Sequence, residues 1–205
     1  NMAEMETNRL RFRLWREDDA EELFGLASDS EVGPMAGWPP HGSVEESLEV
    51  IRTVFASDHV WAWELKETGR IVGCMGYYTH EDSNIGIAET EFEVGYWIGK
   101  EYWNRGYCTE ALRAMIEYCF GTKQATTLWC DYFVDNPASG RVMSKCGFVD
   151  TGRINWLSGL YLGDERPVKI MRLDNPGRDD PSSHHRAAWS HALSRRLSDL
   201  FGDRD

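Results

Sequence analysis

The sequence predicts an α/β (α+β) protein in which helices flank a mixed, largely antiparallel central sheet. Segments with a two-residue hydrophobic alternation are separated by segments with the spacing of amphipathic helices. A short turn at 67–70 joins two of the alternating segments as an antiparallel hairpin. The pattern G-x-G-x-x-G does not follow the first strand, which disfavours a parallel dinucleotide-binding fold.

The N-terminal part is expected to run strand, helix, loop, helix. Residues 10–15 alternate apolar and basic side chains, as a strand does. Acidic residues at 17–19 then open a helix, where negative charge suits the positive end of the helix dipole. Residues 28–42 hold three prolines and three glycines and are predicted to form an ordered loop. Ser43 and Glu46 form a capping-box pattern that starts a second helix.

The middle of the chain is expected to form three strands and a long helix. Residues 60–66 and 71–78 are the two arms of the hairpin, and 89–98 is the next strand. A glycine-bearing loop then leads into a helix at about 109–120, whose apolar residues recur every three to four positions.

The last predicted elements of the domain are a strand, a short helix and two closing strands. The strand spans 127–134, and an Asn-Pro pair at 136–137 starts the helix. Gly147 is expected to end that helix, because glycine adopts the left-handed conformation found there. Residues 148–154 and 168–173 are the closing strands.

These elements predict one domain at 7–175 and a C-terminal tail at 176–205. The tail is expected to contain a polar linker and then an amphipathic helix with Trp189, Leu193 and Leu197 on one face. That face suits packing on the domain or on a second copy of the chain. A homodimer is therefore one expectation, and the sequence does not choose between these two packings and a helix that frays.

Composition narrows the class of partner. The chain of 205 residues carries a net charge of −12, which argues against nucleic acid and favours cationic partners such as amines or basic peptides. Five cysteines show no C-x-x-C pair, so free thiols in a reducing, cytoplasmic setting are expected. Six histidines show no metal-ligand spacing, so no metal is expected. No apolar run is long enough to span a bilayer, so no membrane partner is expected.

The most informative pattern lies at 95–112, where a strand, a loop and a helix follow one another. The first turn of a helix offers free backbone N–H groups and the positive end of the dipole, which together favour a pyrophosphate. Gly106 lets the backbone approach a ligand closely, Cys108 is small, and Arg105 supplies a charged donor. A Walker motif is absent, so nucleoside triphosphate hydrolysis is not predicted.

Gly95-Tyr96-Trp97-Ile98 together with residues 105–111 resembles the acetyl-CoA loop of the GNAT N-acetyltransferase superfamily. Asn136-Pro137-Ala138-Ser139 and Lys145-Cys146-Gly147-Phe148 resemble the second signature of its ribosomal-protein alanine acetyltransferase (RimJ/RimL-like) branch. The resemblance runs from about residue 7 to 175. It implies transfer of acetyl from acetyl-CoA to a primary amine, either a protein N-terminus or a small molecule. It also implies strands that splay at the acetyl-CoA cleft.

The resemblance implies roles for individual residues. The strand edge would bind the pantetheine arm of the cofactor through backbone groups, and the loop would hold the pyrophosphate. The loop between the first helices would wall the acceptor pocket with Met35, Trp38 and His41. The implied cofactor-binding residues are Tyr96, Trp97, Ile98, Trp103, Asn104, Arg105, Gly106, Tyr107, Cys108, Thr109, Asn136 and Ser139.

Three positions depart from the family pattern. Trp103 stands where Gln or Arg is usual, and Cys108 stands where Gly or Ala is usual. Met143 occupies the position of a tyrosine that serves as proton donor in the wider superfamily. Because a thioether has no proton to give, the expected donor becomes Ser139, which the RimL-like branch is thought to use.

Acetyl transfer to an amine needs a neutral amine, a polarised thioester carbonyl and a stabilised leaving thiolate. Glu91 and Glu93 share one face of their strand, so either is a candidate base if burial raises its pKa. The backbone N–H of Trp97 or Ile98 is the candidate donor to the thioester oxygen, and Ser139 is the candidate to protonate the sulfur.

The same residues leave one alternative mechanism and one alternative function to consider. A covalent route through Cys108 is disfavoured, because no histidine lies near it in the motif, and direct attack in a ternary complex is preferred. A catalytically weak acetyl-CoA-binding sensor or interaction module is the alternative function, because Met143 replaces the usual acid.

Overall fold

The computed structural model describes residues 5–157 and 165–177, and the predicted tail helix lies outside these residues. The described chain forms one seven-stranded sheet with the order β1-β2-β3-β4-β5-β7-β6. Only the β4–β5 pair is parallel, so the prediction of a mixed, largely antiparallel sheet is confirmed. The strands are β1 (Leu10–Leu14), β2 (Val60–Leu65), β3 (Ile71–Tyr78), β4 (Glu91–Ile98), β5 (Thr127–Phe133), β6 (Val149–Leu157) and β7 (Arg166–Asp174).

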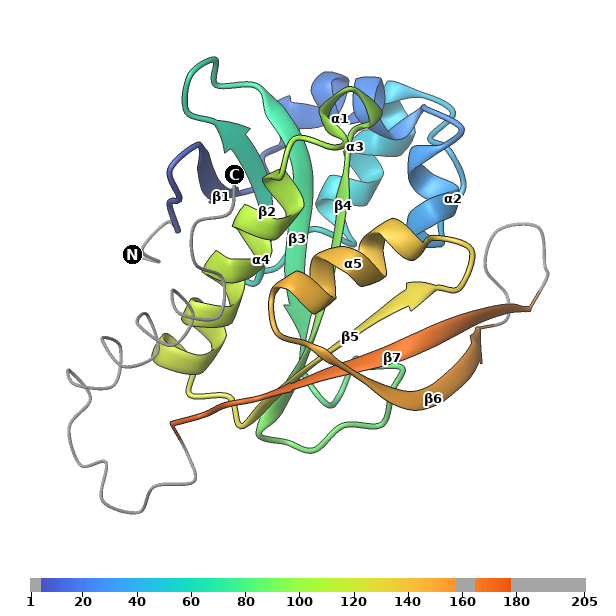
Figure 1. Ribbon diagram of the computed structural model, residues 1–205. Helices are drawn as coiled ribbons and strands as arrows, with labels where there is room; N and C mark the ends of the chain where they lie inside the picture. The colour runs from blue at the N-terminus through green and yellow to red at the C-terminus, as the bar shows by residue number, and fades with distance from the viewer. Residues whose placement is uncertain (1–4, 158–164, 178–205) are drawn as a thin grey trace.

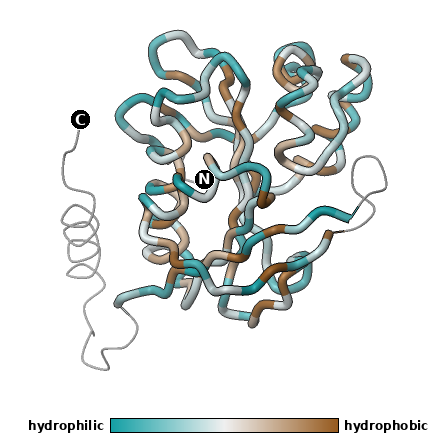
Figure 2. The backbone as a smooth tube through the Cα atoms, turned by 45° about the vertical axis from the view of Figure 1, so that its right-hand side comes forward, coloured by the Kyte–Doolittle hydropathy of each residue, from teal (hydrophilic) through white to brown (hydrophobic). Residues whose placement is uncertain are grey.

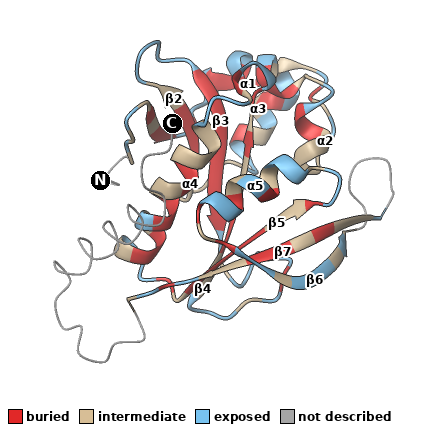
Figure 3. Ribbon diagram, viewed as in Figure 1, coloured by how far each residue is buried: buried red, intermediate tan, exposed pale blue. Residues whose placement is uncertain are grey.

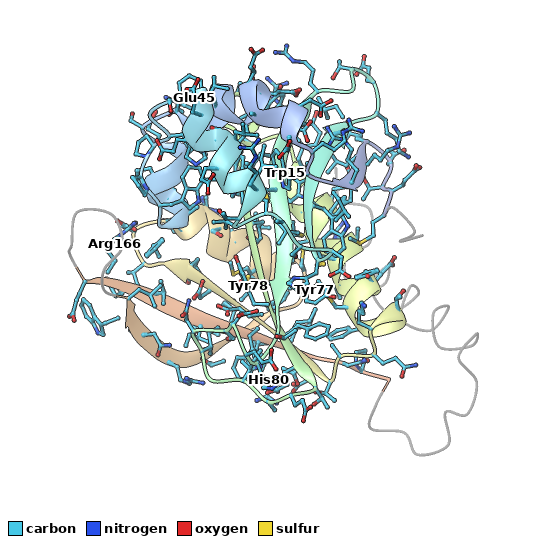
Figure 4. All side chains as sticks on the ribbon, turned by 180° about the vertical axis from the view of Figure 1, so that it is seen from behind. Trp15, Glu45, Tyr77, Tyr78, His80 and Arg166 are labelled. Atoms are coloured by element: carbon cyan, nitrogen blue, oxygen red, sulfur yellow. The ribbon has the colours of Figure 1, made fainter. Side chains whose placement is uncertain are left out.

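Helices cover both faces of the sheet. Figure 1 shows α4 and α5 in front of the central strands, and Figure 4 shows the other face covered by α1, α2 and α3. The helices are α1 (Ala20–Ala27), α2 (Val32–Ala36), α3 (Val44–Arg52), α4 (Tyr107–Glu117) and α5 (Pro137–Lys145).

The core lies along the central strands and under α4. Figure 3 shows burial along most of β2 and β3 and exposure along much of the edge strand β6, and Figure 2 shows hydrophobic residues gathered on inner strands of the sheet. Trp61 and Trp63 of β2 are among the largest fully buried side chains, as are Leu112 and Met115 of α4. Burial of such large side chains supplies most of the free energy of folding.

The largest differences from the predicted elements concern the loop at 28–42 and the two ends of the long helix. The expected loop at 28–42 contains the short helix α2. This helix tolerates Pro34, because a proline near the start of a helix removes no intrahelical hydrogen bond. The helix predicted from about 109 begins at Tyr107, because Gly106 has a φ of 79° and ends the loop there. It ends as an α-helix at Glu117 and continues as a π-helical turn, Tyr118–Thr122.

The second helix begins as predicted but with a modified cap. The Ser43 side chain accepts a hydrogen bond from the Glu46 backbone N–H at 3.1 Å. The Glu46 carboxylate accepts from the Gly42 backbone N–H at 2.6 Å, instead of from Ser43 as a capping box would have it.

Strands β4 and β5 are paired only over part of their length. The register joins Glu91–Val94 of β4 to Thr127–Cys130 of β5, whereas β4 continues to Ile98 and β5 to Phe133. Figure 1 shows the two strands together at the bottom of the sheet and apart towards the top. The predicted splay is therefore present, and it leaves one edge of β4 without a neighbouring strand.

Candidate active site

The start of α4 presents a group of unpaired backbone donors. Within the described residues, the N–H groups of Tyr107, Cys108 and Thr109 form no hydrogen bond, and the first bonded amide is that of Glu110, which donates to the Gly106 carbonyl at 3.1 Å. No side chain caps this helix end. Such amides, together with the helix dipole, favour an anion.

Two residues from the N-terminal edge of the sheet hold this helix start in place. The Arg9 guanidinium donates to Glu110 at 2.8 Å and to the Arg105 carbonyl at 2.9 Å, and it lies 4.2 Å from the centre of the Tyr107 ring. Thr7 also donates to the Glu110 carboxylate. Burial raises the pKa of Glu110, but the hydrogen bonds from Thr7 and Arg9 outweigh it and the net shift is downward. Sequence reasoning missed this support, because it joins segments about a hundred residues apart.

The loop before α4 has one left-handed residue besides Gly106. Asn104 has a φ of 60°, a conformation that asparagine tolerates better than most residues. The Trp103 indole N–H donates to the Ile98 carbonyl at 3.2 Å. Trp103, which departs from the family pattern, therefore bonds the loop to the end of β4.

The free edge of β4 is formed by alternate backbone groups. The Gly99 amide donates to Val72 of β3 at 2.8 Å, and the β3–β4 register then directs the N–H and C=O of Trp97 to β3 as well. The backbone groups of Tyr96 and Ile98 point the other way, towards the space left by β5. Of the two expected donors to a thioester oxygen, the geometry thus favours Ile98 over Trp97.

The first turn of α5 faces the same edge. Asn136 is its N-cap residue, and its side chain makes no hydrogen bond within the described part of the chain. Ser139 lies one turn into the helix, with its hydroxyl 3.1 Å from the Tyr96 hydroxyl. Met143 is buried at 1% exposure in the core and takes no part in this surface.

The two candidate carboxylates differ sharply in their surroundings. Glu93 is 7% exposed, on the sheet face opposite α4 and α5. Burial raises the pKa of Glu93, and hydrogen bonds from the Ser83 side chain and the Asn84 backbone offset part of the rise. Glu91 is more open, and its carboxylate accepts from the Ala88 amide at 2.7 Å, which closes the turn before β4. Of the two candidate bases, Glu93 is therefore the one whose pKa burial raises, whereas the Glu91 carboxylate is already bonded to the Ala88 amide.

A third carboxylate, Asp131, was not singled out in the sequence. It follows Cys130, the last residue of β5 that pairs with β4, and it lies on the same face as Glu93. Within the described residues no donor bonds to its carboxylate. Burial, and then the charge of Glu93, raise the pKa of Asp131 to about 7. The signal for it was only an acidic residue inside a strand of apolar neighbours.

The three residues expected to line the acceptor pocket differ in their surroundings. Met35 belongs to α2, and Trp38 packs edge-on against Trp97 with ring centres 5.5 Å apart. His41 is 9% exposed, and its Nδ1 lies 2.7 Å from the Ser47 hydroxyl of α3. Burial lowers the pKa of His41. Its ring centre lies 5.2 Å from that of Trp38, so His41 packs against Trp38.

Arg166, at the start of β7, connects this wall to the turn before α5. Its guanidinium donates to the Pro34 carbonyl of α2 at 2.5 Å and to the Asp135 carboxylate at 3.3 Å. It also stacks 3.6 Å from the centre of the Phe133 ring. Figure 4 shows Arg166 beside α2, at the outer end of β7.

The cysteines offer little nucleophilic character. All five are free thiols, and burial raises the pKa of Cys108 to about 12. This opposes the lowering that a helix start would bring. Within residues 5–157 and 165–177 there is no group of three or more His, Cys, Asp or Glu side chains placed to hold a metal ion. No helix in the same residues is long and apolar enough to cross a membrane.

Comparisons with known proteins found relatives in sequence and in fold. The chain is 28% identical over 153 residues to the uncharacterized N-acetyltransferase YoaA of Bacillus subtilis, covering 72% of this chain and 84% of that protein. The ribosomal-protein-S5-alanine acetyltransferase of Vibrio fischeri superposes with a TM-score of 0.61 at 20% identity, covering 85% of this chain and 97% of that one. The acetyltransferase MccE, solved with acetyl-CoA and AMP, superposes with a TM-score of 0.66 at 18% identity, covering 82% and 93%.

The Acetyltransferase (GNAT) domain family matches residues 9–149, which include every strand from β1 to β5 and the whole of α4 and α5. The free amides at the start of α4 and the splay of β4 from β5 lie inside the matched range. The chain is therefore a GNAT acetyltransferase, an enzyme of the N-acetyltransferase superfamily that the sequence resembles.

Proposed function

We propose that this enzyme transfers acetyl from acetyl-CoA to a primary amine by direct attack in a ternary complex. The observation that carries the proposal is the set of unpaired amides at Tyr107, Cys108 and Thr109, next to the unpaired edge of β4. These groups fit the pyrophosphate and the amide-bearing arm of coenzyme A, because one needs a cluster of N–H donors and the other a free strand edge.

Several residues would hold the cofactor. The amides from Arg105 to Thr109 would bind the pyrophosphate, and the backbone groups of Tyr96 would bind the pantetheine arm, because the Ile98 carbonyl already accepts from Trp103. Asn136, the N-cap residue at the start of α5, has a side chain without a hydrogen bond in the described residues and would reach this arm. Acetyl-CoA supplies an activated acetyl group as a thioester.

Glu93 is the proposed base. An amine is protonated at neutral pH, so one proton must leave before its nitrogen can attack. A carboxylate whose pKa is raised by burial accepts that proton more readily than an exposed one. The Ile98 amide would donate to the thioester oxygen, and Ser139 would donate its hydroxyl hydrogen to the departing sulfur.

The acceptor is proposed to be cationic. The sheet face that carries Glu93 also carries Asp131, and the chain as a whole has a net charge of −12. Both features favour a protonated amine over an anionic acceptor. An N-terminal peptide and a small polyamine remain two forms of this class, and both belong in the acceptor panel.

Labelled acetyl-CoA tests the proposal when it is incubated with N-terminal peptides beginning with alanine or serine and with polyamines. Transfer to at least one amine is expected, and Glu93→Gln should lower kcat about 100-fold while Glu91→Gln changes it little. Equal losses in the two variants would remove Glu93 as the base. Calorimetric binding of coenzyme A with no transfer to any amine would instead favour a sensor.

A further inference from the structure

A tyrosine of β4 and a serine of α5 meet on the sheet face that carries α4 and α5. The Tyr96 hydroxyl lies 3.1 Å from the Ser139 hydroxyl and 3.4 Å from the Ser139 carbonyl. The carbonyl is inside α5, where it can accept from the amide four residues on, so the shorter contact between the hydroxyls is the better hydrogen bond.

The distance between the two hydroxyls is fixed by close packing of α5 on the sheet. Gly140 faces the ring of Tyr132 on β5 so closely that an added Cβ would lie 2.6 Å from it. The helix therefore rests on the sheet with no room for a side chain at this point. Gly140 directly follows Ser139 in α5, so the same contact fixes the position of Ser139.

Tyr96 is suited to donate this hydrogen bond. Burial raises the pKa of Tyr96 well above its ordinary value, so the phenol keeps its proton throughout the neutral pH range. A serine hydroxyl has one hydrogen and can accept two hydrogen bonds. If its oxygen accepts from Tyr96, its own hydrogen is free to point elsewhere.

We propose that Tyr96 is a positioning residue that donates to the Ser139 oxygen and so directs the Ser139 hydrogen to the departing sulfur. The inference rests on the proposed function of Ser139. Glu93 passes the first proton of the ammonium to solvent; as the nitrogen then forms the C–N bond and loses its second proton to Glu93, the C–S bond breaks and the sulfur keeps its electron pair. The sulfur takes hydrogen from Ser139, which regains one from solvent, while Tyr96 keeps its proton.

The Tyr96–Ser139 pair also accounts for the methionine in α5. Met143 is buried in the core at 1% exposure and offers no proton. The pair places the Tyr96 phenol, which comes from strand β4, against α5. Chained hydroxyls polarise one another, so a serine that accepts from a phenol is a stronger donor than an isolated serine.

The test uses the full-length enzyme and four variants: Tyr96→Phe, Ser139→Ala, the double variant and the control Tyr132→Phe. Tyr132 packs on the same helix, and its hydroxyl makes no hydrogen bond within the described residues. Tyr96→Phe should lower kcat about tenfold, the loss expected for one hydrogen bond in the transition state, with KM for acetyl-CoA within about twofold. Tyr132→Phe should leave both unchanged.

The double variant separates this inference from the proposed function. Tyr96→Phe should cost nothing further in the Ser139→Ala background, because Tyr96 acts only through Ser139. The same loss in both backgrounds would overturn the inference, as would a normal kcat accompanied by a raised KM or a lower Tm. If Ser139→Ala is impaired and Tyr96→Phe is not, only this inference fails. If Ser139→Ala is fully active, the role proposed for Ser139 fails as well.

Ser139→Thr keeps the hydroxyl and gives a further readout. It should retain most of the wild-type kcat and should stay sensitive to Tyr96→Phe, because the chain from phenol to hydroxyl is intact. A Ser139→Thr enzyme that is indifferent to Tyr96→Phe would contradict the hydrogen-bond chain.

Discussion

Replacing Asp131 by Asn should change how the stability of the enzyme depends on pH. The pKa of Asp131 is raised from 3.8 to about 7, first by burial and then by the charge of Glu93. A carboxyl group with a raised pKa favours the folded state while it is protonated and loses that contribution as the pH rises through its folded pKa. The wild-type protein should therefore lose stability between pH 5 and pH 8, and part of that loss should be absent in the variant.

The magnitude follows from the shift. Each pKa unit corresponds to 1.36 kcal/mol, and the folded protein holds this proton up to about pH 7 whereas the unfolded chain has released it by pH 5. The wild-type free energy of unfolding should therefore fall by about 2 to 3 kcal/mol more than that of Asp131→Asn between pH 5 and pH 8. Asparagine has the same shape, so a constant offset between the proteins is expected to be smaller than this slope.

Urea unfolding followed by tryptophan fluorescence measures the difference at pH 5, 6, 7 and 8. Glu67→Gln, an exposed change in the β2–β3 turn, is the matched control and should follow the wild type. Parallel curves for Asp131→Asn and the wild type across this range would refute the placement of Asp131 as a half-buried carboxylate with no donor bonded to it in the described part of the chain.

Further predictions concern the cofactor loop and the acceptor wall. Gly106→Ala should raise the Kd for coenzyme A at least tenfold by calorimetry, because the residue has a φ of 79° and its new Cβ would lie 3.4 Å from the Arg9 guanidinium. Glu110→Gln should lower Tm and weaken coenzyme A binding by a smaller factor, since it loses the ion pair with Arg9; equal Kd values would show that the pair does not support the loop. Cys108 should react with iodoacetamide at pH 8 about 100-fold more slowly than a free cysteine, as mass spectrometry can measure, because its pKa is about 12. Arg166→Ala should raise KM for the acceptor several-fold and leave KM for acetyl-CoA nearly unchanged, and a uniform rise in both would contradict its role at α2.

The sequence predicted the sheet and the cofactor loop because both depend on short-range patterns. Alternation placed the strands within a few residues, and the run around Gly106 identified the helix start. The short helix α2 was missed, because its glycine and proline content is typical of loops. In the structure the carbonyls of Gly33 and Pro34 accept hydrogen bonds from Gly37 and Arg166.

The candidate site was predicted less completely, because its distinctive features arise from contacts between distant segments. Glu91 and Glu93 are equivalent by spacing, and only burial separates them. Nothing near Asp131 in the sequence indicates that it lies where two strands part. Likewise, Tyr96 and Ser139 are 43 residues apart, and only the docking of α5 on the sheet brings their hydroxyls together.

The support that Arg9 gives to α4 means that cofactor recognition belongs to the assembled sheet and not to the motif alone. Arg9 reaches across 101 residues to Glu110 and across 96 to the carbonyl of Arg105. A peptide of residues 95–112, or the same segment grafted onto another scaffold, would contain Gly106 but would lack the hydrogen bonds from Arg9 that hold the loop and the helix start. For the same reason, a substitution at Arg9, just before the first strand, would disturb the segment where coenzyme A binding is proposed without changing that segment's own sequence.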